Sequence, residues 1–113
     1  KSFDKAIDIN SKYTLAWVEK GKSLRELEEY SDAIECFDKA ISFAPKNIDA
    51  WYNKGLVLGD MQRYDEALKC FDEVLTINPN YALAWTAKGN AYLSLGKETE
   101  ANEAFAKAQT LSS

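Results

Sequence analysis

The chain has 113 residues, which is enough for one domain, and hydrophobic residues make up 46% of it, so it can bury a core. Its net charge is -4, whereas a surface that binds phosphates needs an excess of Lys and Arg, so we expect no nucleic-acid partner. No apolar run approaches the roughly 20 residues that span a bilayer, and the charged start does not look like a signal peptide. These features predict a cytoplasmic protein with no membrane partner.

The sequence repeats itself at a period of 34 residues. Trp17, Trp51 and Trp85 keep this spacing, and so do Gly21, Gly55 and Gly89, Lys20, Lys54 and Lys88, and Ala33, Ala67 and Ala101. A phenylalanine recurs from Phe3 to Phe105 at the same step, and the string from Phe3 to Ile7 returns unchanged from Phe37 to Ile41. So many matches at one offset indicate an array of structural repeats.

Each period predicts two helices. A leading helix over residues 1–13 is followed by one from Leu15 to Leu27, which has apolar residues at helical spacing. A turn comes next, in which Ser31 is the candidate N-cap of a helix from Asp32 to Phe43. Pro45 then disfavours helix at the residue before it and ends the period.

The later periods follow the same plan. The predicted helices are Asp49–Asp60 and Asp65–Ile77, closed by Pro79, then Leu83–Leu95 and Glu98–Leu111, with Gly96 as a stop between the last two. A recurring glycine lies inside the first helix of every pair, where it costs about 1 kcal/mol relative to Ala. We therefore expect a neighbouring helix to approach each glycine too closely for a side chain.

These residues resemble the tetratricopeptide repeat family. The family pattern combines a Trp, a small residue four positions later, an Ala and a Phe on the second helix, and a closing Pro. The matching residues are Trp17, Gly21, Ala33, Phe37 and Pro45, then Trp51, Gly55, Ala67, Phe71 and Pro79, then Trp85, Gly89, Ala101 and Phe105. The string at residues 50–55 is similar to prokaryotic and archaeal arrays. Lysines replace the family's usual Leu at Lys20, Lys54 and Lys88, where the long stem can cover apolar surface while the amine reaches water.

The resemblance implies an all-α superhelix, a solenoid of stacked antiparallel helix hairpins. We expect the second helix of an upstream repeat over residues 1–13 and repeats over residues 14–47, 48–81 and 82–113, the last being a C-terminal cap. The cap prediction rests on Asn102 and Gln109, which are polar where earlier repeats have Ile or Leu. The leading segment keeps the internal apolar pattern, so weak self-association is expected at that end.

Family membership also implies a concave groove, lined by the first helix of each pair, that binds a protein or peptide segment as part of a larger scaffold. The candidate peptide-binding residues are Leu15, Val18 and Lys22 from the first repeat, Tyr52, Asn53 and Leu56 from the second, and Leu83, Ala87 and Asn90 from the third. The alternative is a structural repeat that self-associates through its open ends and leaves the groove empty.

The carboxylate clamp of chaperone-binding family members is not expected here. That clamp uses Lys, Asn, Asn, Lys and Arg at five groove positions, which are Val18, Lys22, Asn53, Leu83 and Ala87 in this chain. Only Asn53 matches, so the clamp's cations, which would make charge-assisted bonds to a carboxylate, are missing.

Enzyme chemistry has little support. The chain has no His, which is the commonest general base and metal ligand. Its acidic residues suit solvated helix starts. Cys36 and Cys70 hold equivalent positions in consecutive repeats, which should lie too far apart for a disulfide, so free thiols are expected. We predict no catalytic residue, no metal and no cofactor.

Overall fold

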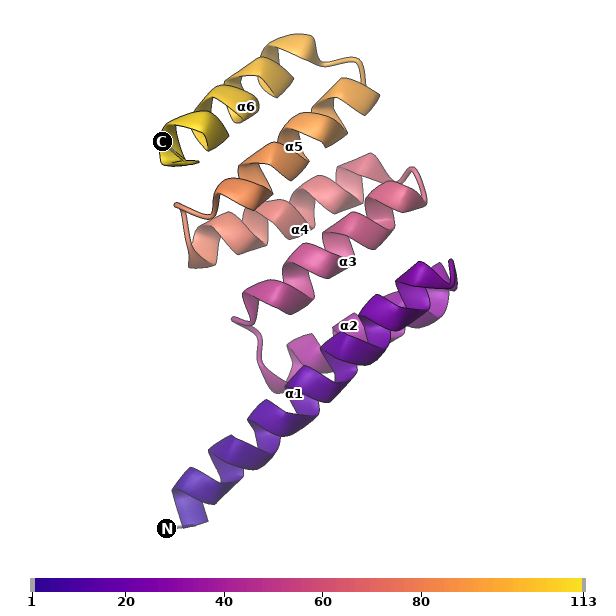
Figure 1. Ribbon diagram of the computed structural model, residues 1–113, viewed down its shortest axis with the longest axis vertical. Helices are drawn as coiled ribbons and strands as arrows, with labels where there is room; N and C mark the ends of the chain where they lie inside the picture. The colour runs from indigo at the N-terminus through magenta and orange to yellow at the C-terminus, as the bar shows by residue number, and fades with distance from the viewer. Residues whose placement is uncertain (1, 113) are drawn as a thin grey trace.

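The computed structural model describes the backbone of residues 2–112 and the side chains of residues 12–112. It contains six helices, which are α1 (Ser2–Glu26), α2 (Tyr30–Phe43), α3 (Ile48–Asp60), α4 (Tyr64–Ile77), α5 (Ala82–Ser94) and α6 (Glu98–Ser112). Consecutive helices pack as hairpins that stack along one direction, from α1 to α6 (Figure 1). No strand occurs in these residues, and the predicted all-α stack of hairpins is confirmed.

Helix α1 differs from the prediction, because it is one continuous helix where a leading helix and a first helix were expected. Its start projects well beyond the stack (Figure 1). The physical reason lies in Ser11, which stands 34 residues before Pro45 and 68 before Pro79. Those two prolines end α2 and α4, whereas nothing at Ser11 removes a backbone donor or disfavours helix. The helix therefore continues through the repeat boundary that was predicted after residue 13.

The turn inside each hairpin is built in the same way three times. Glu28, Gln62 and Gly96 have positive φ angles of 61°, 64° and 78°, and each lies just after a first helix. Around Gln62, the N–H of Arg63 donates to the carbonyl of Leu58 and the N–H of Gln62 donates to the carbonyl of Gly59. This pair of bonds satisfies the helix end as a Schellman motif.

The early turn corrects one prediction about α2. The helix begins at Tyr30, after an N-cap at Glu29 whose side chain makes no capping hydrogen bond. Ser31 therefore lies inside the first turn of α2 instead of capping it. The Schellman motif reverses the chain within three residues, which brings the start of α2 forward.

The recurring glycines are confirmed as points of close approach, and their neighbours are the recurring phenylalanines. A Cβ atom added at Gly21 or Gly55 would lie 2.5 Å from the ring of Phe37 or Phe71. The ring of Phe105 occupies the same place beside Gly89. A first helix thus carries glycine where the ring of its own second helix fills the space, which locks the two helices of a hairpin together.

The tryptophans and lysines connect successive hairpins. The indole Nε1 of Trp51 donates to the carbonyl of Pro45 at 2.7 Å. The Lys54 amine lies 5.8 Å from the Trp51 ring centroid and 2.7 Å from a carboxylate oxygen of Asp38 in α2. Lys88 pairs in the same way with Trp85 and with Asp72 in α4. The amines of Lys54 and Lys88, which were expected to reach water, thus each form an ion pair with the second helix of the preceding repeat.

Candidate functional site

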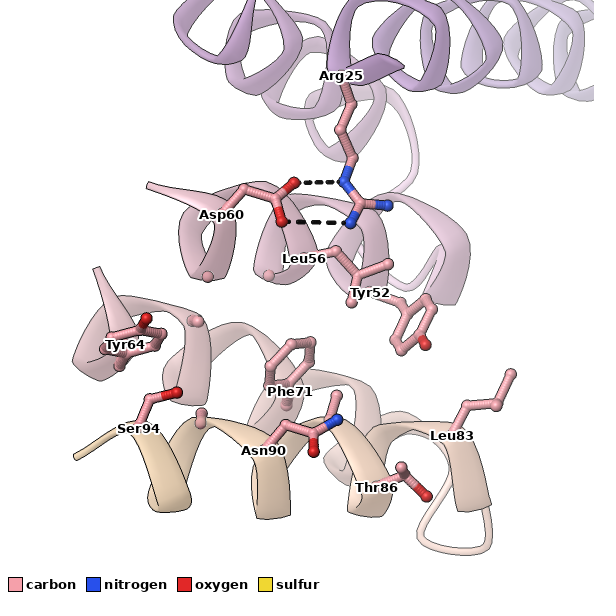
Figure 2. A pocket seen from close by; sticks show the side chains of 15 residues that line it. Arg25, Tyr52, Leu56, Asp60, Tyr64, Phe71, Leu83, Thr86, Asn90 and Ser94 are labelled. Carbon is pink, nitrogen blue, oxygen red and sulfur yellow. Dashed lines mark hydrogen bonds and ion pairs between the residues drawn. The ribbon is translucent and has the colours of Figure 1, made fainter. Parts of the chain in front are cut away.

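The first helices of the three hairpins form one face of the stack, because α3 contacts both α1 and α5 directly. Between α3 and α5 this face contains an open hollow of about 310 Å³. Figure 2 shows side chains of α3 and α5 converging on it, with Phe71 of α4 behind them. Its lining includes Tyr52, Leu56, Phe71, Leu83, Thr86, Ala87, Asn90 and Ser94. The hollow therefore has an apolar floor and a partly polar rim.

The rings of Tyr52 and Phe71 line this hollow, and the Tyr81 ring packs against Tyr52. The Tyr52 ring lies 6.0 Å from that of Phe71 and meets the ring of Tyr81 edge-on at 5.7 Å, measured between centroids. Burial raises the pKa of both tyrosines above the usual value, so the hydroxyls stay neutral at physiological pH and are available as hydrogen-bond donors. Tyr81 precedes α5, and the sequence analysis did not include it because it lies outside the first helices.

An ion pair between α1 and α3 borders the hollow. Arg25 of α1 donates two hydrogen bonds to Asp60 of α3, at 2.6 Å from Nε and 3.4 Å from Nη2 (Figure 2). The bond to Asp60 is the main reason that the pKa of Arg25 lies above its ordinary value. This pair could not be found from the period of the sequence, because neither residue has a charged equivalent in the third repeat.

A second, charged hollow of about 330 Å³ lies between α1 and α3. It is lined by Lys22, Arg25, Glu26, Asn53 and Asp60, and so it shares the ion pair with the apolar hollow. Asn53 is only 9% exposed, and its side-chain Nδ2 donates to the backbone carbonyl of Asp49 at 2.7 Å. Part of its hydrogen-bonding capacity is therefore used within α3.

The structure brings together five of the nine predicted binding residues and separates the others. Tyr52, Leu56, Leu83, Ala87 and Asn90 line the apolar hollow, and Lys22 and Asn53 line the charged one. Leu15 is 61% exposed and lies outside both hollows. Val18 is a correction, since it is 2% exposed and belongs to the core cluster with Phe37 and Val57. It cannot contact a ligand, because at its register α1 packs against α2 and α3.

The described residues offer little for catalysis or metal binding. Among them, no three His, Cys, Asp or Glu side chains lie close enough to hold a metal ion. Cys36 and Cys70 are free, as predicted; both are buried, and burial raises the pKa of the Cys70 thiol to about 11. A buried neutral thiol is a poor nucleophile. From residue 2 to residue 112, no helix combines the length and apolar character that a membrane span requires.

Comparison with known structures finds the same helix stack elsewhere. A crystal structure of MamA is 28% identical, with a TM-score of 0.84 over 88% of this chain and 58% of the MamA chain. This chain thus spans little more than half of that protein. The first tetratricopeptide domain of Spaghetti (RPAP3), bound to the HSP90 peptide SRMEEVD, is 24% identical, with a TM-score of 0.86 over 89% of this chain and 80% of that domain. At that identity the likeness shows the fold alone.

Comparison with family models supplies the family. Two models described as tetratricopeptide repeats match residues 48–81 and 70–103, and one described as a TPR repeat matches residues 21–62. A search of curated protein sequences finds no match. Together the three family matches cover residues 21 to 103, over the helix hairpins described above, and the chain belongs to the tetratricopeptide repeat family.

Proposed function

We propose that the chain is a non-enzymatic protein-interaction module, which binds an extended peptide segment on its concave face at the hollow between α3 and α5. One observation carries the proposal, namely that this hollow has an apolar floor, hydrogen-bonding groups at its rim and an opening to solvent. Ligand sites in proteins combine these features. The module would act within a larger scaffold in the cytoplasm, holding its partner in place rather than transforming it.

The shape of the hollow favours a peptide that carries one bulky apolar side chain. That side chain would pack against Tyr52, Leu56 and Phe71, which present rings and an aliphatic branch rather than charge. The rim groups of Thr86, Asn90 and Ser94 on α5 would hydrogen-bond the peptide backbone on either side. Tyrosine suits such a site because its ring is large and rigid while its hydroxyl satisfies a polar neighbour.

The ligand proposed here differs from the chaperone peptide held by the RPAP3 domain. A carboxylate clamp needs cations on the first helix of the third repeat, α5, where this chain has Leu83 and Ala87. The remaining groove cations have carboxylate neighbours of their own, since Arg25 is bonded to Asp60 and Lys22 lies 3.4 Å from Glu19. The concave face therefore favours an apolar anchor over a terminal carboxylate.

Selection from a displayed library of random peptides, followed by titration of the selected peptides into the ¹⁵N-labelled chain, tests this proposal. We expect amide shifts to cluster at Tyr52, Leu56 and Asn90. Thr86 is exposed and lines the hollow, so Thr86→Arg should fill the hollow without opening the core and weaken binding by about tenfold or more.

Thr76→Arg is the matched control. Thr76 is also exposed, but it lies on α4 away from the hollow, and its hydroxyl bonds only to the carbonyl of Asp72 in its own helix. The Thr76→Arg variant should therefore bind the selected peptides as tightly as the original chain. The groove proposal fails if no peptide is selected, if the shifts fall outside the concave face, or if the two variants bind equally well.

A further inference from the structure

Two hollows lie on the side of the stack that carries the tryptophans and cysteines, and residues 34 positions apart line them. They differ in whether a helix of the preceding repeat also contributes to the lining. The later one, of about 660 Å³, is lined by Trp51, Lys54, Leu58 and Cys70, and also by Ile34 and Asp38 of the preceding repeat's second helix. The earlier one, of about 670 Å³, is lined by Trp17, Lys20, Leu24 and Cys36 at positions 34 residues before. Among the described side chains, from Lys12 onward, none that belongs to a preceding repeat lines this earlier hollow.

The lysines at this register differ in whether a described aspartate pairs with them. Lys54 and Lys88 each lie 2.7 Å from an aspartate 16 residues before them, and their side chains are 22% and 13% exposed. Lys20 also lies over its tryptophan, at 5.4 Å from the Trp17 ring, but its side chain is exposed. Among the side chains from Lys12 onward, no carboxylate lies within ion-pair distance of its amine. By the same register its missing partner is Asp4.

The chain contains the sequence that fits this hollow. Residues 3–7 are identical to residues 37–41, the part of α2 that supplies Phe37 and Ala40 to the core and Asp38 to Lys54. Within one copy the two cannot meet. Asp4 and Lys20 belong to the same continuous helix, and 16 residues of α-helix separate them by about 24 Å.

We propose that two copies of the chain associate by exchanging the starts of α1, so that residues 3–9 of each copy occupy the Trp17–Lys20–Leu24 hollow of the other. The two α1 helices then lie antiparallel about a two-fold axis beside Lys12, which is midway between Asp4 and Lys20. Because of this midpoint, one symmetric arrangement makes both Asp4–Lys20 contacts at once. The interface is closed and isologous, as in most homodimers, and the exchange of an identical element is a low-cost route to a dimer.

The proposed interface repeats a contact that the structure already contains. In one copy, the second helix of one repeat packs on the first helix of the next, as α2 does on α3 and α4 on α5. In the dimer, the start of α1 would take the place of α2, and the partner's α1 would take the place of α3. The sequence analysis expects self-association at this end, and the open hollow around Lys20 identifies the surface that receives it.

Sedimentation equilibrium on the full chain, from about 5 µM to about 500 µM, tests the proposal, because dimer formation follows mass action. We expect a concentration-dependent dimer. Asp4→Lys and Lys20→Asp should each weaken it by at least about tenfold, since each places like charges in both contacts. An equimolar mixture of the two variants should form a heterodimer as tight as the original dimer, because both contacts then regain opposite charges.

Glu100→Lys on α6 is the control, since it makes the same change in charge at an exposed position remote from the hollow. It should leave the dimer intact. The proposal is overturned if the chain stays monomeric over the whole range, if the dimer tolerates Asp4→Lys, or if mixing the two variants restores nothing. Circular dichroism of each variant separates a lost contact from a lost fold, because only the latter removes helical signal.

Discussion

The two sides of α3 differ in how much their residue types vary between repeats. On the side that packs, Trp51, Lys54 and Gly55 recur in every repeat and make equivalent contacts, such as a glycine against a phenylalanine ring. On the concave side, the position of Leu56 carries Lys22 in the first repeat and Asn90 in the third. Positions that must fit a neighbouring repeat have few solutions, whereas positions that face solvent or a ligand are free to differ. The contrast predicts large stability effects on one side and binding effects on the other.

Truncating the packing side should have the largest effect. Trp51→Ala removes an indole that packs on the core and donates a hydrogen bond to Pro45, so we expect the free energy of unfolding to fall by about 3–5 kcal/mol. Leu83→Ala on the concave side, where the side chain is 57% exposed, should change it by less than about 0.5 kcal/mol. Urea titration followed by circular dichroism measures the free energy of unfolding of both variants. Equal decreases for the two would contradict the proposed difference between the packing side and the concave side.

Two glycines of α3 test the same contrast with one methyl group each. Gly55→Ala drives a Cβ into the Phe71 ring, so it should destabilise the fold by about 1–3 kcal/mol despite alanine's better helix propensity. Gly59 has nothing within 4 Å of an added Cβ, so Gly59→Ala should stabilise by about 0.5–1 kcal/mol. Opposite signs in thermal melts are the expected result, and equal signs would contradict the proposed packing.

Burial of Cys70 on the packing side should make the free energy of unfolding depend on pH at high pH. Burial raises the pKa of Cys70 from 9.0 to about 11, so the thiol ionises in the unfolded chain before it does so in the folded one. Stability is unaffected below the unfolded pKa and falls as pH rises from about 9 to about 11, by roughly 1 kcal/mol at pH 10. Urea titrations in reducing buffer should show a shallower decline for Cys70→Ala, and identical slopes would mean that water reaches the thiol.

The hairpin turns should show the smallest effect. Gln62 adopts a positive φ at an energetic cost that Gly96 avoids, so Gln62→Gly should stabilise by a few tenths to about 1 kcal/mol. Gly96→Ala should destabilise by about 1 kcal/mol, because it introduces the same strain where none exists now. Melting temperatures that move in the same direction for both variants would mean that φ is not what limits these turns.

The fold could be predicted because the repeated residues are those that pack. The spacing of Trp51, Gly55 and Pro79 is enough to predict the helices, the close approach and the break between repeats. Features that occur once could not be found by periodicity. The Arg25–Asp60 pair joins helices of different repeats, and a missing proline at Ser11 leaves α1 continuous. Val18 was misplaced because residue type and register alone do not say how closely α1 packs on its neighbours.

The order of contacts along the stack has a consequence for how the chain folds. Each helix touches the next one in sequence, and the remaining contacts, α1 with α3 and α3 with α5, reach no farther than the adjacent hairpin. Loops that must close are therefore short, which favours folding within microseconds to milliseconds. A stack held together by neighbours alone also opens from its ends. Amide protons of α3 and α4, which have neighbours on both sides, should exchange most slowly with solvent.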